Sequence, residues 1–390
     1  MVNPIKFIRN IFPVIFLLFS AAACAQVRPV VQTGASRLDA ILSAVGNRPV
    51  GLFVNQTAMV GKTHLADTLL SRGVRVMKIY SPEHGFRGDA DAGEDVGNGN
   101  DPRSGLPIIS LYGPNKKPKP AQLEGVDIIL FDMQDIGVRF FTYISSLHYM
   151  MEACAENGKK LIILDRPNPN GGYVDGPVLE KEFKSFVGMH PVPVVHGMTI
   201  GEYGTMVNGE GWLTGGVKCD LEVIRVVGWK HGDPWHVEVK PSPNLPNDHA
   251  IRIYPSTCFF EGTVLSIGRG TMNPFEQAGH PDITGYAHTF TPVSIPGMAK
   301  TPLLENKVCR GMDMRSMKVR ERLDLSPLIE LYKAFPDKDG YFISYFEKLA
   351  GTASLREQIR QGMGEDKIRE SWQPGLKAFV GVRKKYLLYP

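Results

Sequence analysis

Residues 126–135 read VDIILFDMQD, an apolar run that ends in polar and acidic side chains. A short apolar run with such an end favours a buried β-strand, which we place at Val126–Phe131. Three other segments of the first half have the same design, and we expect strands at Pro49–Val54, Val74–Ile79 and Lys160–Leu164. Continuous apolar strands are typical of a parallel sheet that helices cover on both faces.

Helical patterns separate these strands. Apolar residues at helical spacing predict a helix over 37–45, and further helices are expected over 63–73 and 143–157. Strands that alternate with helices indicate βαβ units, so the sequence predicts an α/β fold built on a parallel sheet.

The pattern changes after a polar, proline-rich stretch at 240–248, where we place a domain boundary. The larger domain would cover 26–250, and the smaller domain would cover 251–390. A short strand pattern lies at 314–319, and helical patterns follow at 326–335, 344–349, 354–362 and 372–389. This mixture predicts an α+β architecture for the smaller domain.

The first 25 residues read as an export signal. Lys6 and Arg9 precede an apolar run that is too short to span a bilayer, and small residues follow it. Cleavage after Ala25 would release a soluble protein, whereas cleavage before Cys24 would leave a cysteine for lipid attachment. Either cut predicts an exported, periplasmic protein, in the second case a lipoprotein.

Composition excludes several classes of partner and site. The chain is 43% hydrophobic and its net charge of +4 falls to +2 without the signal, so neither nucleic acid nor charge-driven membrane binding is expected. The cysteines at 154, 219, 258 and 309 form no CxxC pair, which favours buried thiols, with a disulfide as the alternative. We therefore predict no metal.

The turn after the first strand excludes a nucleotide cofactor. It reads NQTAMVGKTHL and lacks GxGxxG, and Gln56 stands where a P-loop needs its first glycine. The acidic segment at 89–100 also fails as a calcium loop, because its sixth and twelfth positions are Glu94 and Asn100.

Polar residues gather where the carboxyl ends of the predicted strands meet, which is where open parallel sheets bind ligands. Glu83 is the leading candidate, because a partly buried carboxyl at a strand end can serve as a general acid. Its alternative role is to cap a turn. The other candidates from these strand ends and nearby loops are His84, Arg87, Asp132, Gln134, Asp135, Arg139, Asp165, Arg166, Asn168, His196, Glu202, Glu261 and Arg269.

Structural roles compete with these assignments. Asp135 and Glu202 each stand near an expected helix start, where an acid is favourable. Arg139 lies among apolar residues and needs an anionic partner. His84 could be a structural hydrogen-bonding group, and Asn168 could serve only to shape its turn.

Seven motifs resemble the secreted exo-β-N-acetylmuramidase family of bacterial glycoside hydrolases. They are SPEHGFRG (81–88), DAGE (91–94), FDMQDIGVRFFTYI (131–144), LDRPNPNGG (164–172), HGMTIGEYG (196–204), PSPNLP (241–246) and EGTVLSIGRGT with PF (261–275). The resemblance implies a Rossmann-like catalytic domain, a smaller C-terminal domain that completes a cleft, and removal of terminal muramic acid from peptidoglycan fragments. It makes Glu83 the leading catalytic carboxylate. Ile267 departs from the family, which usually has an acid there.

Glycoside hydrolysis needs a proton donor and a second group that acts as base or nucleophile. Our hypothesis assigns the donor to Glu83 and the second role to Glu202 or Asp132, working with His196. The lactyl carboxylate of muramic acid would suit a guanidinium. The candidates for that contact are Arg139, Arg166 and Arg269.

Two other functions compete with hydrolysis of muramic acid glycosides. A non-catalytic envelope protein that binds cell-wall sugars would keep the Asn and Arg groups without needing an acid at position 83. A metal hydrolase using Glu83, His84 and Asp132 is weaker, because no HExxH spacing or paired histidine ligands occur.

Overall fold

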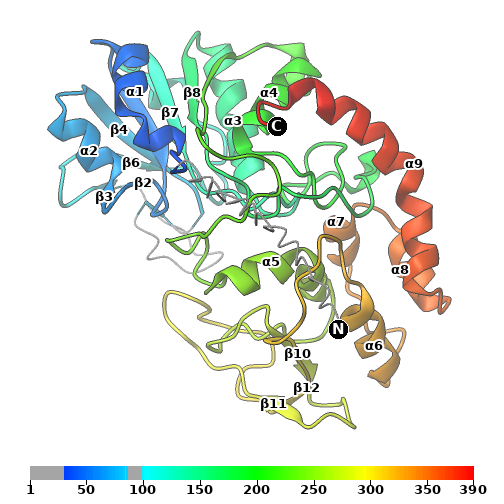
Figure 1. Cartoon of the computed structure of the whole chain (residues 1–390). Helices are drawn as coiled ribbons and strands as arrows, with labels where there is room; N and C mark the ends of the chain where they lie inside the picture. Colours follow the sequence, from blue (N-terminus) through cyan, green and yellow to red (C-terminus); the bar gives the residue numbers. More distant parts are fainter. Residues whose placement is uncertain (1–29, 84, 87–98) are drawn as a thin grey trace, which may run out of the picture. The chain divides into compact units, whose positions relative to one another are not determined.

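The computed structural model describes residues 30–83, 85–86 and 99–390, and its main feature is a seven-stranded sheet (Figure 1). The strand order is β5-β6-β4-β1-β7-β8-β9. All neighbouring strands run parallel except β5 against β6. The strands are β1 (Val50–Val54), β4 (Val76–Ser81), β5 (Gly99–Asn100), β6 (Pro107–Ser110), β7 (Ile128–Asp132), β8 (Lys160–Leu164) and β9 (Asp220–Ile224).

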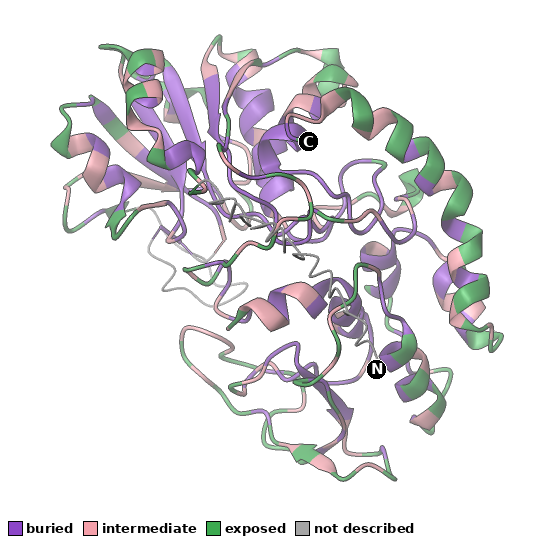
Figure 2. Cartoon of the chain, in the orientation of Figure 1, coloured by how far each residue is buried: buried purple, intermediate pink, exposed green. Residues whose placement is uncertain are grey.

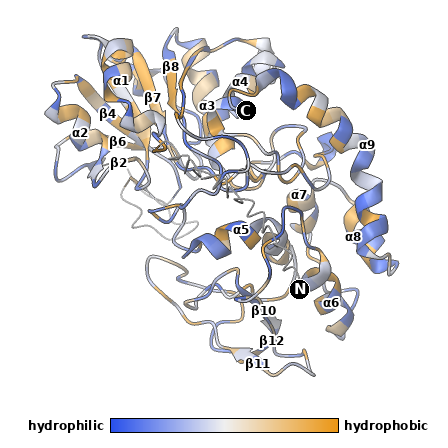
Figure 3. Cartoon of the chain, in the orientation of Figure 1, coloured by the Kyte–Doolittle hydropathy of each residue, from blue (hydrophilic) through white to orange (hydrophobic). Residues whose placement is uncertain are grey.

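Helices cover both faces of this sheet, which confirms the α/β prediction. On β7, Ile128 and Leu130 pack with α1 (Leu38–Val45) and α2 (Leu65–Ser71) in one core. Ile129 and Phe131 point the other way, into a core with α3 (Tyr143–Glu156) and α4 (Ile200–Gly209). The central strands β1 and β7 are therefore buried over their whole length and lack polar side chains except for Asp132 at the end of β7 (Figures 2 and 3).

The second half adds a three-stranded antiparallel sheet and several helices. Its strand order is β10-β12-β11, from β10 (Gln277–His280), β11 (His288–Phe290) and β12 (Cys309–Asp313). The helices are α5 (Asp248–Thr257), α6 (Ser326–Ala334), α7 (Phe346–Ala350), α8 (Ser354–Arg360) and α9 (Glu365–Arg383). The first half of the chain also contains a small antiparallel hairpin, formed by β2 (Met59–Val60) and β3 (Thr63–His64).

Contacts group residues 31–390 into one compact unit. The larger core is continuous across position 250, since it contains Phe140 together with Phe259 and Phe346. The division at residue 250 stays a prediction.

Two sequence expectations need correction, and two elements of the structure were not expected. The strand expected at 314–319 lies earlier, at β12, because Asp313 accepts a hydrogen bond from the Arg315 amide and turns the chain there. The last helix begins at Glu365 and ends at Arg383, not at Tyr389. Helix α5 and strand β9 were not expected.

All four cysteines of the described chain are buried free thiols. Among the described helices, none is long and apolar enough to cross a membrane. The export signal lies outside the described residues.

Candidate active site

One cavity of about 290 Å³ contains Glu83 and is called the Glu83 cavity below. Residues from both halves of the chain form its wall. They are Glu83, Phe140, Phe141, Thr142, Tyr143, Val187, Ser242, Tyr254, Glu261, Arg269 and Tyr345. Of the side chains named from the sequence, it brings together Glu83, Glu261 and Arg269.

Glu83 follows β4, and two hydroxyl groups orient its carboxylate. Tyr112 donates to Oε1 at 2.9 Å, and Thr142 donates to Oε2 at 3.5 Å. Burial, with the Glu83 charge as a second cause, raises the pKa of Tyr112. Tyr112 therefore stays protonated and remains a hydrogen-bond donor at neutral pH.

Glu261 and Arg269 form an ion pair on the same cavity. Arg269 Nε donates to Glu261 Oε1 at 2.6 Å, and the guanidinium lies over the Phe275 ring. Burial alone would lower the pKa of Arg269, but the Glu261 carboxylate reverses this effect and raises it. Arg269 Nη1 is buried and has no hydrogen-bond partner within the described chain. It is therefore an unsatisfied donor on a residue of the cavity wall.

Tyr345 lines the same cavity as the two glutamates. Burial raises its pKa, and the charges of Cys258, Glu261 and Glu83 add to the effect. One phenol thus senses both carboxylates of the cavity.

Asp132, Gln134 and Arg166 lie elsewhere. Asp132 is fully buried and accepts from Arg166 Nε at 2.5 Å and from Nη2 at 2.8 Å. Gln134 and Arg166 line a separate cavity, whereas Asp132 lines neither cavity. Asp132 therefore balances a buried cation and does not face the Glu83 cavity as the hypothesis required.

Arg139 holds backbone in place and does not bind a ligand. It is fully buried, and its Nη1 donates to the carbonyl groups of Pro177 and Val192. Its Nη2 donates to those of Leu349 and Ala350 at 2.8 and 2.7 Å. The sequence predicted an anionic partner for Arg139, but the partners in the structure are backbone carbonyl groups.

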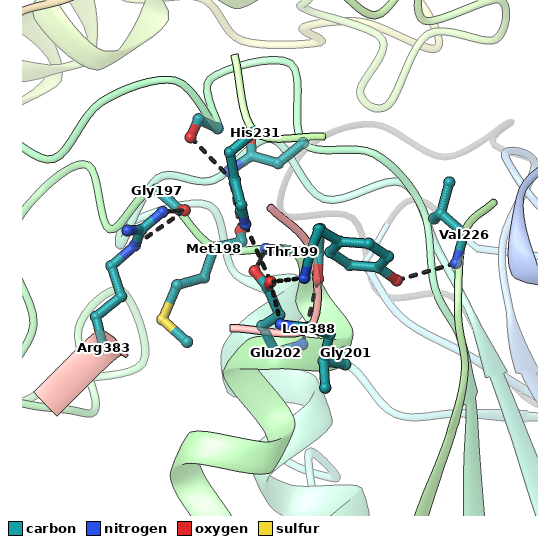
Figure 4. A network of polar contacts seen from close by, with 12 residues as sticks. Gly197, Met198, Thr199, Gly201, Glu202, Val226, His231, Arg383 and Leu388 are labelled. Carbon is teal, nitrogen blue, oxygen red and sulfur yellow. Dashed lines mark hydrogen bonds and ion pairs between the residues drawn. The ribbon is translucent and has the colours of Figure 1, made fainter. Parts of the chain in front are cut away.

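Glu202 is the centre of a structural network (Figure 4). It sits in a capping box at the start of α4, where Oε2 accepts from the Thr199 amide at 2.9 Å. Oε1 accepts from the amides of Leu388 and Tyr389, and it lies 3.0 Å from His231 Nε2. A fully buried carboxylate with these partners docks the C-terminal tail and does not reach the Glu83 cavity.

His196 is also structural. Burial, with the charges of Arg383 and Arg139 in second place, lowers its pKa to about 3. Its ring packs on Tyr203, and Nδ1 accepts from the Met198 amide at 3.3 Å. A fully buried, neutral imidazole at this position cannot exchange protons with a substrate in the Glu83 cavity.

Asp165 and Asn168 shape the carboxyl edge of the sheet. Asp165 accepts from Thr199 Oγ1 at 2.7 Å and from Tyr389 Oη at 2.6 Å, and burial raises its pKa to about 6. Asn168 donates to the Met198 carbonyl at 2.9 Å and accepts from the Asn170 amide. Both are buried side chains that brace loops.

Asp135 is a buried acid that forms no ion pair with any residue that the structure describes. Its Oδ2 accepts from the Gly137 amide at 2.7 Å, while Oδ1 has no partner in the described chain. Burial raises its pKa to about 7. Its position therefore favours the neutral acid and makes ionisation costly.

We expect Asp135→Asn to change how stability depends on pH. Because the folded-state pKa is raised, the contribution of Asp135 to wild-type stability is fully present below about pH 4. It is lost as the pH rises through about 7. Asn can still accept from Gly137, so the variant should gain on the order of 2 kcal/mol relative to wild type between pH 5 and pH 8. Urea unfolding at pH 5 and pH 8 measures the free energy of unfolding of both proteins. The same difference between variant and wild type at the two pH values would contradict the prediction.

His84 and Arg87 lie outside the described residues. No group of three potential metal ligands occurs among the residues that the structure does describe. The sequence did not single out Tyr112, Thr142, Tyr254 or Tyr345. Tyr112 ends the apolar run at 107–112, so the strand-end rule that found Glu83 could also have found it.

Comparison with known proteins identifies the family. Residues 50–249 match the N-terminal profile of "Exo-beta-N-acetylmuramidase NamZ", and residues 252–389 match its C-terminal profile. The chain belongs to the exo-β-N-acetylmuramidase family. A curated relative, the peptidoglycan beta-N-acetylmuramidase NamZ of Bacillus subtilis (strain 168), is 38% identical and covers 93% of this chain and 92% of its own. This confirms the resemblance that the motifs indicated.

Two solved structures from Bacteroides fragilis share the exo-β-N-acetylmuramidase fold of this chain. Both are described as DUF1343 family proteins. One is 45% identical with a TM-score of 0.86, and the other is 29% identical with a TM-score of 0.79. Each match covers 92% of this chain and 99% of the relative. The fold is therefore shared over nearly the whole length of both relatives.

Proposed function

We propose that this protein hydrolyses the bond of a terminal, non-reducing β-N-acetylmuramic acid in peptidoglycan fragments, with the Glu83 cavity as its active site. Family membership supports the reaction. The observation that supports the place is a single cavity lined by two carboxylates and an arginine. Its volume of about 290 Å³ lies at the lower end of the roughly 300–1,000 Å³ that ligand pockets enclose, which suits a small ligand such as one sugar unit.

Glu83 is assigned as the proton donor to the leaving oxygen. Glu261 takes the second role, in place of Glu202 and Asp132, because among the described residues it is the second carboxylate that lines the cavity. Its ion pair with Arg269 fixes the carboxylate in position. A positioned carboxylate can activate water or stabilise positive charge on the sugar ring.

Arg269 is assigned to the lactyl carboxylate of muramic acid. That carboxylate distinguishes muramic acid from glucosamine. The other two candidates are set aside: Arg139 donates to backbone carbonyls, and Arg166 lines the other cavity. Arg269 lines the Glu83 cavity with Nη1 unpartnered in the described chain.

We expect Arg269→Lys to raise KM about tenfold for a chromogenic β-N-acetylmuramide, because a lysine cannot form two parallel hydrogen bonds to a carboxylate. KM for the matching glucosaminide should change much less. Steady-state kinetics on both substrates measure this. Equal effects on the two sugars would remove Arg269 from this role.

The proposed function itself is tested with the wild-type protein on the same two substrates. Release from the muramide, with little from the glucosaminide, is the expected result. A folded protein that binds muramic acid without releasing the chromophore would instead be an envelope sugar-binding protein. Full activity in the presence of the chelator EDTA would exclude the alternative that the protein is a metal-dependent hydrolase.

We also propose that the protein is exported to the periplasm, where peptidoglycan fragments arise. Lys6, Arg9 and the apolar run after them support export, and Cys24 supports lipid attachment. Intact-mass measurement of the protein from cells distinguishes a lipidated Cys24 from a chain cut after Ala25. An uncut, cytoplasmic chain would contradict the proposal.

A further inference from the structure

A second cavity, of about 180 Å³, lies where the strand order of the large sheet reverses, and we call it the switch-point cavity. The chain passes from β1 to β4 on one side and continues through β7, β8 and β9 on the other. Thr57 and Gln134 follow the carboxyl ends of β1 and β7 and line this cavity. Doubly wound sheets bind ligands at this place. The cavity shares no lining residue with the Glu83 cavity.

The polar groups of the switch-point cavity are fixed before any ligand arrives. The side-chain Nε2 of Gln134 donates to two backbone carbonyls, and the backbone N–H of the same residue donates to Thr57 Oγ1 at 2.9 Å. Arg166, 7% exposed, is held by Asp132 and by the Met59 carbonyl. Within the described chain Arg166 donates from Nε and Nη2, and no hydrogen bond is donated by its Nη1. A rigid wall with one unused donor is therefore present.

Trp235 gives the cavity an aromatic wall. Its Nε1 donates to Gln134 Oε1 at 3.0 Å, which fixes the ring against the polar floor. The indole is only partly buried, so an aromatic surface stays accessible. An aromatic face beside a few fixed polar groups is suited to a flat ligand with an apolar face and a polar edge.

Charge decides between the ligand classes that fit such a wall. Asp132 neutralises the Arg166 cation at close range, and the exposed Glu238 adds a negative charge to the cavity lining. The balance does not favour an anion. A pyranose ring with an acetamido group is neutral, has an apolar face for Trp235, and carries an acceptor for Arg166 Nη1.

We propose that the switch-point cavity binds a neutral N-acetylated sugar, at a site separate from the one where the muramic acid bond would be cleaved. One chain segment borders both cavities, with Val239 on the switch-point side and Ser242 on the other. Tyr143 of the Glu83 cavity accepts from Asn55 at 2.7 Å, and Asn55 accepts from Thr57 at 2.6 Å. An occupant would therefore lie next to the active site.

The test uses N-acetylglucosamine as the probe and measures its binding to Glu83→Gln protein by saturation-transfer NMR. Binding is expected, and adding Trp235→Ala should weaken it about tenfold through loss of the aromatic wall. Trp235→Phe keeps an aromatic face and should retain most of the binding. If Trp235→Ala does not fold, Val239→Trp blocks the same cavity with bulk.

Two outcomes would overturn the proposal. One is binding that is absent from the folded Glu83→Gln protein or that persists unchanged when the cavity is altered. The other is binding that is lost on adding Arg269→Ala, since that would place the sugar in the Glu83 cavity. Because no hydrolysis is measured, these failures are separate from failure of the proposed function.

Discussion

Glu83→Gln is expected to lower kcat on a chromogenic β-N-acetylmuramide by about 10²–10⁴-fold, the usual contribution of a general acid. The glutamine keeps the size of the side chain; its carbonyl oxygen can accept from Tyr112, and its NH2 group can donate to the Thr142 hydroxyl in place of the bond that Glu83 accepts. It cannot donate the proton that the leaving oxygen needs. KM should change little, because the glutamine has the same size and can keep one hydrogen bond to each neighbouring hydroxyl.

The control for this variant is Glu124→Gln, an exposed glutamate that lines neither cavity. It should leave kcat and the thermal midpoint unchanged. Glu83→Gln should also keep its thermal midpoint. Retention of more than about a tenth of wild-type kcat would count against Glu83 as the proton donor.

Glu202→Ala is expected to destabilise the fold by about 3–5 kcal/mol, because it leaves buried donors without an acceptor. The Thr199, Leu388 and Tyr389 amides all lose their partner (Figure 4). The C-terminal tail should detach with them, since these bonds hold it to the start of α4. Denaturant unfolding measures the loss.

Glu210→Ala, at the other end of α4, is the matched control. Its carboxylate is partly exposed and pairs with Tyr386 and Lys385, so the expected loss is within about 1 kcal/mol. Folded Glu202→Ala, assayed at low temperature, should keep most of its kcat. A large fall in kcat with unchanged stability would restore Glu202 to catalysis.

The local sequence was enough to determine the sheet. Segments such as VDIILF carry apolar side chains on both faces, and only a strand covered on two sides buries them all. The strand-end rule also placed Glu83 correctly at an edge, and the motifs identified the family. These are properties of single segments, so no distant contact is needed to recognise them.

Tertiary structure alone decided which polar residues share a cavity. Asp132, Arg139 and Glu202 are as polar as Glu83, but partners from distant segments occupy their hydrogen-bonding groups. Asp132 pairs with Arg166, Arg139 donates to carbonyls of α7, and Glu202 accepts from the C-terminal tail. Glu261 and Arg269 reach Glu83 only because the second half of the chain packs against the first. Long-range packing sets which side chains are left facing a cavity, and no local pattern records it.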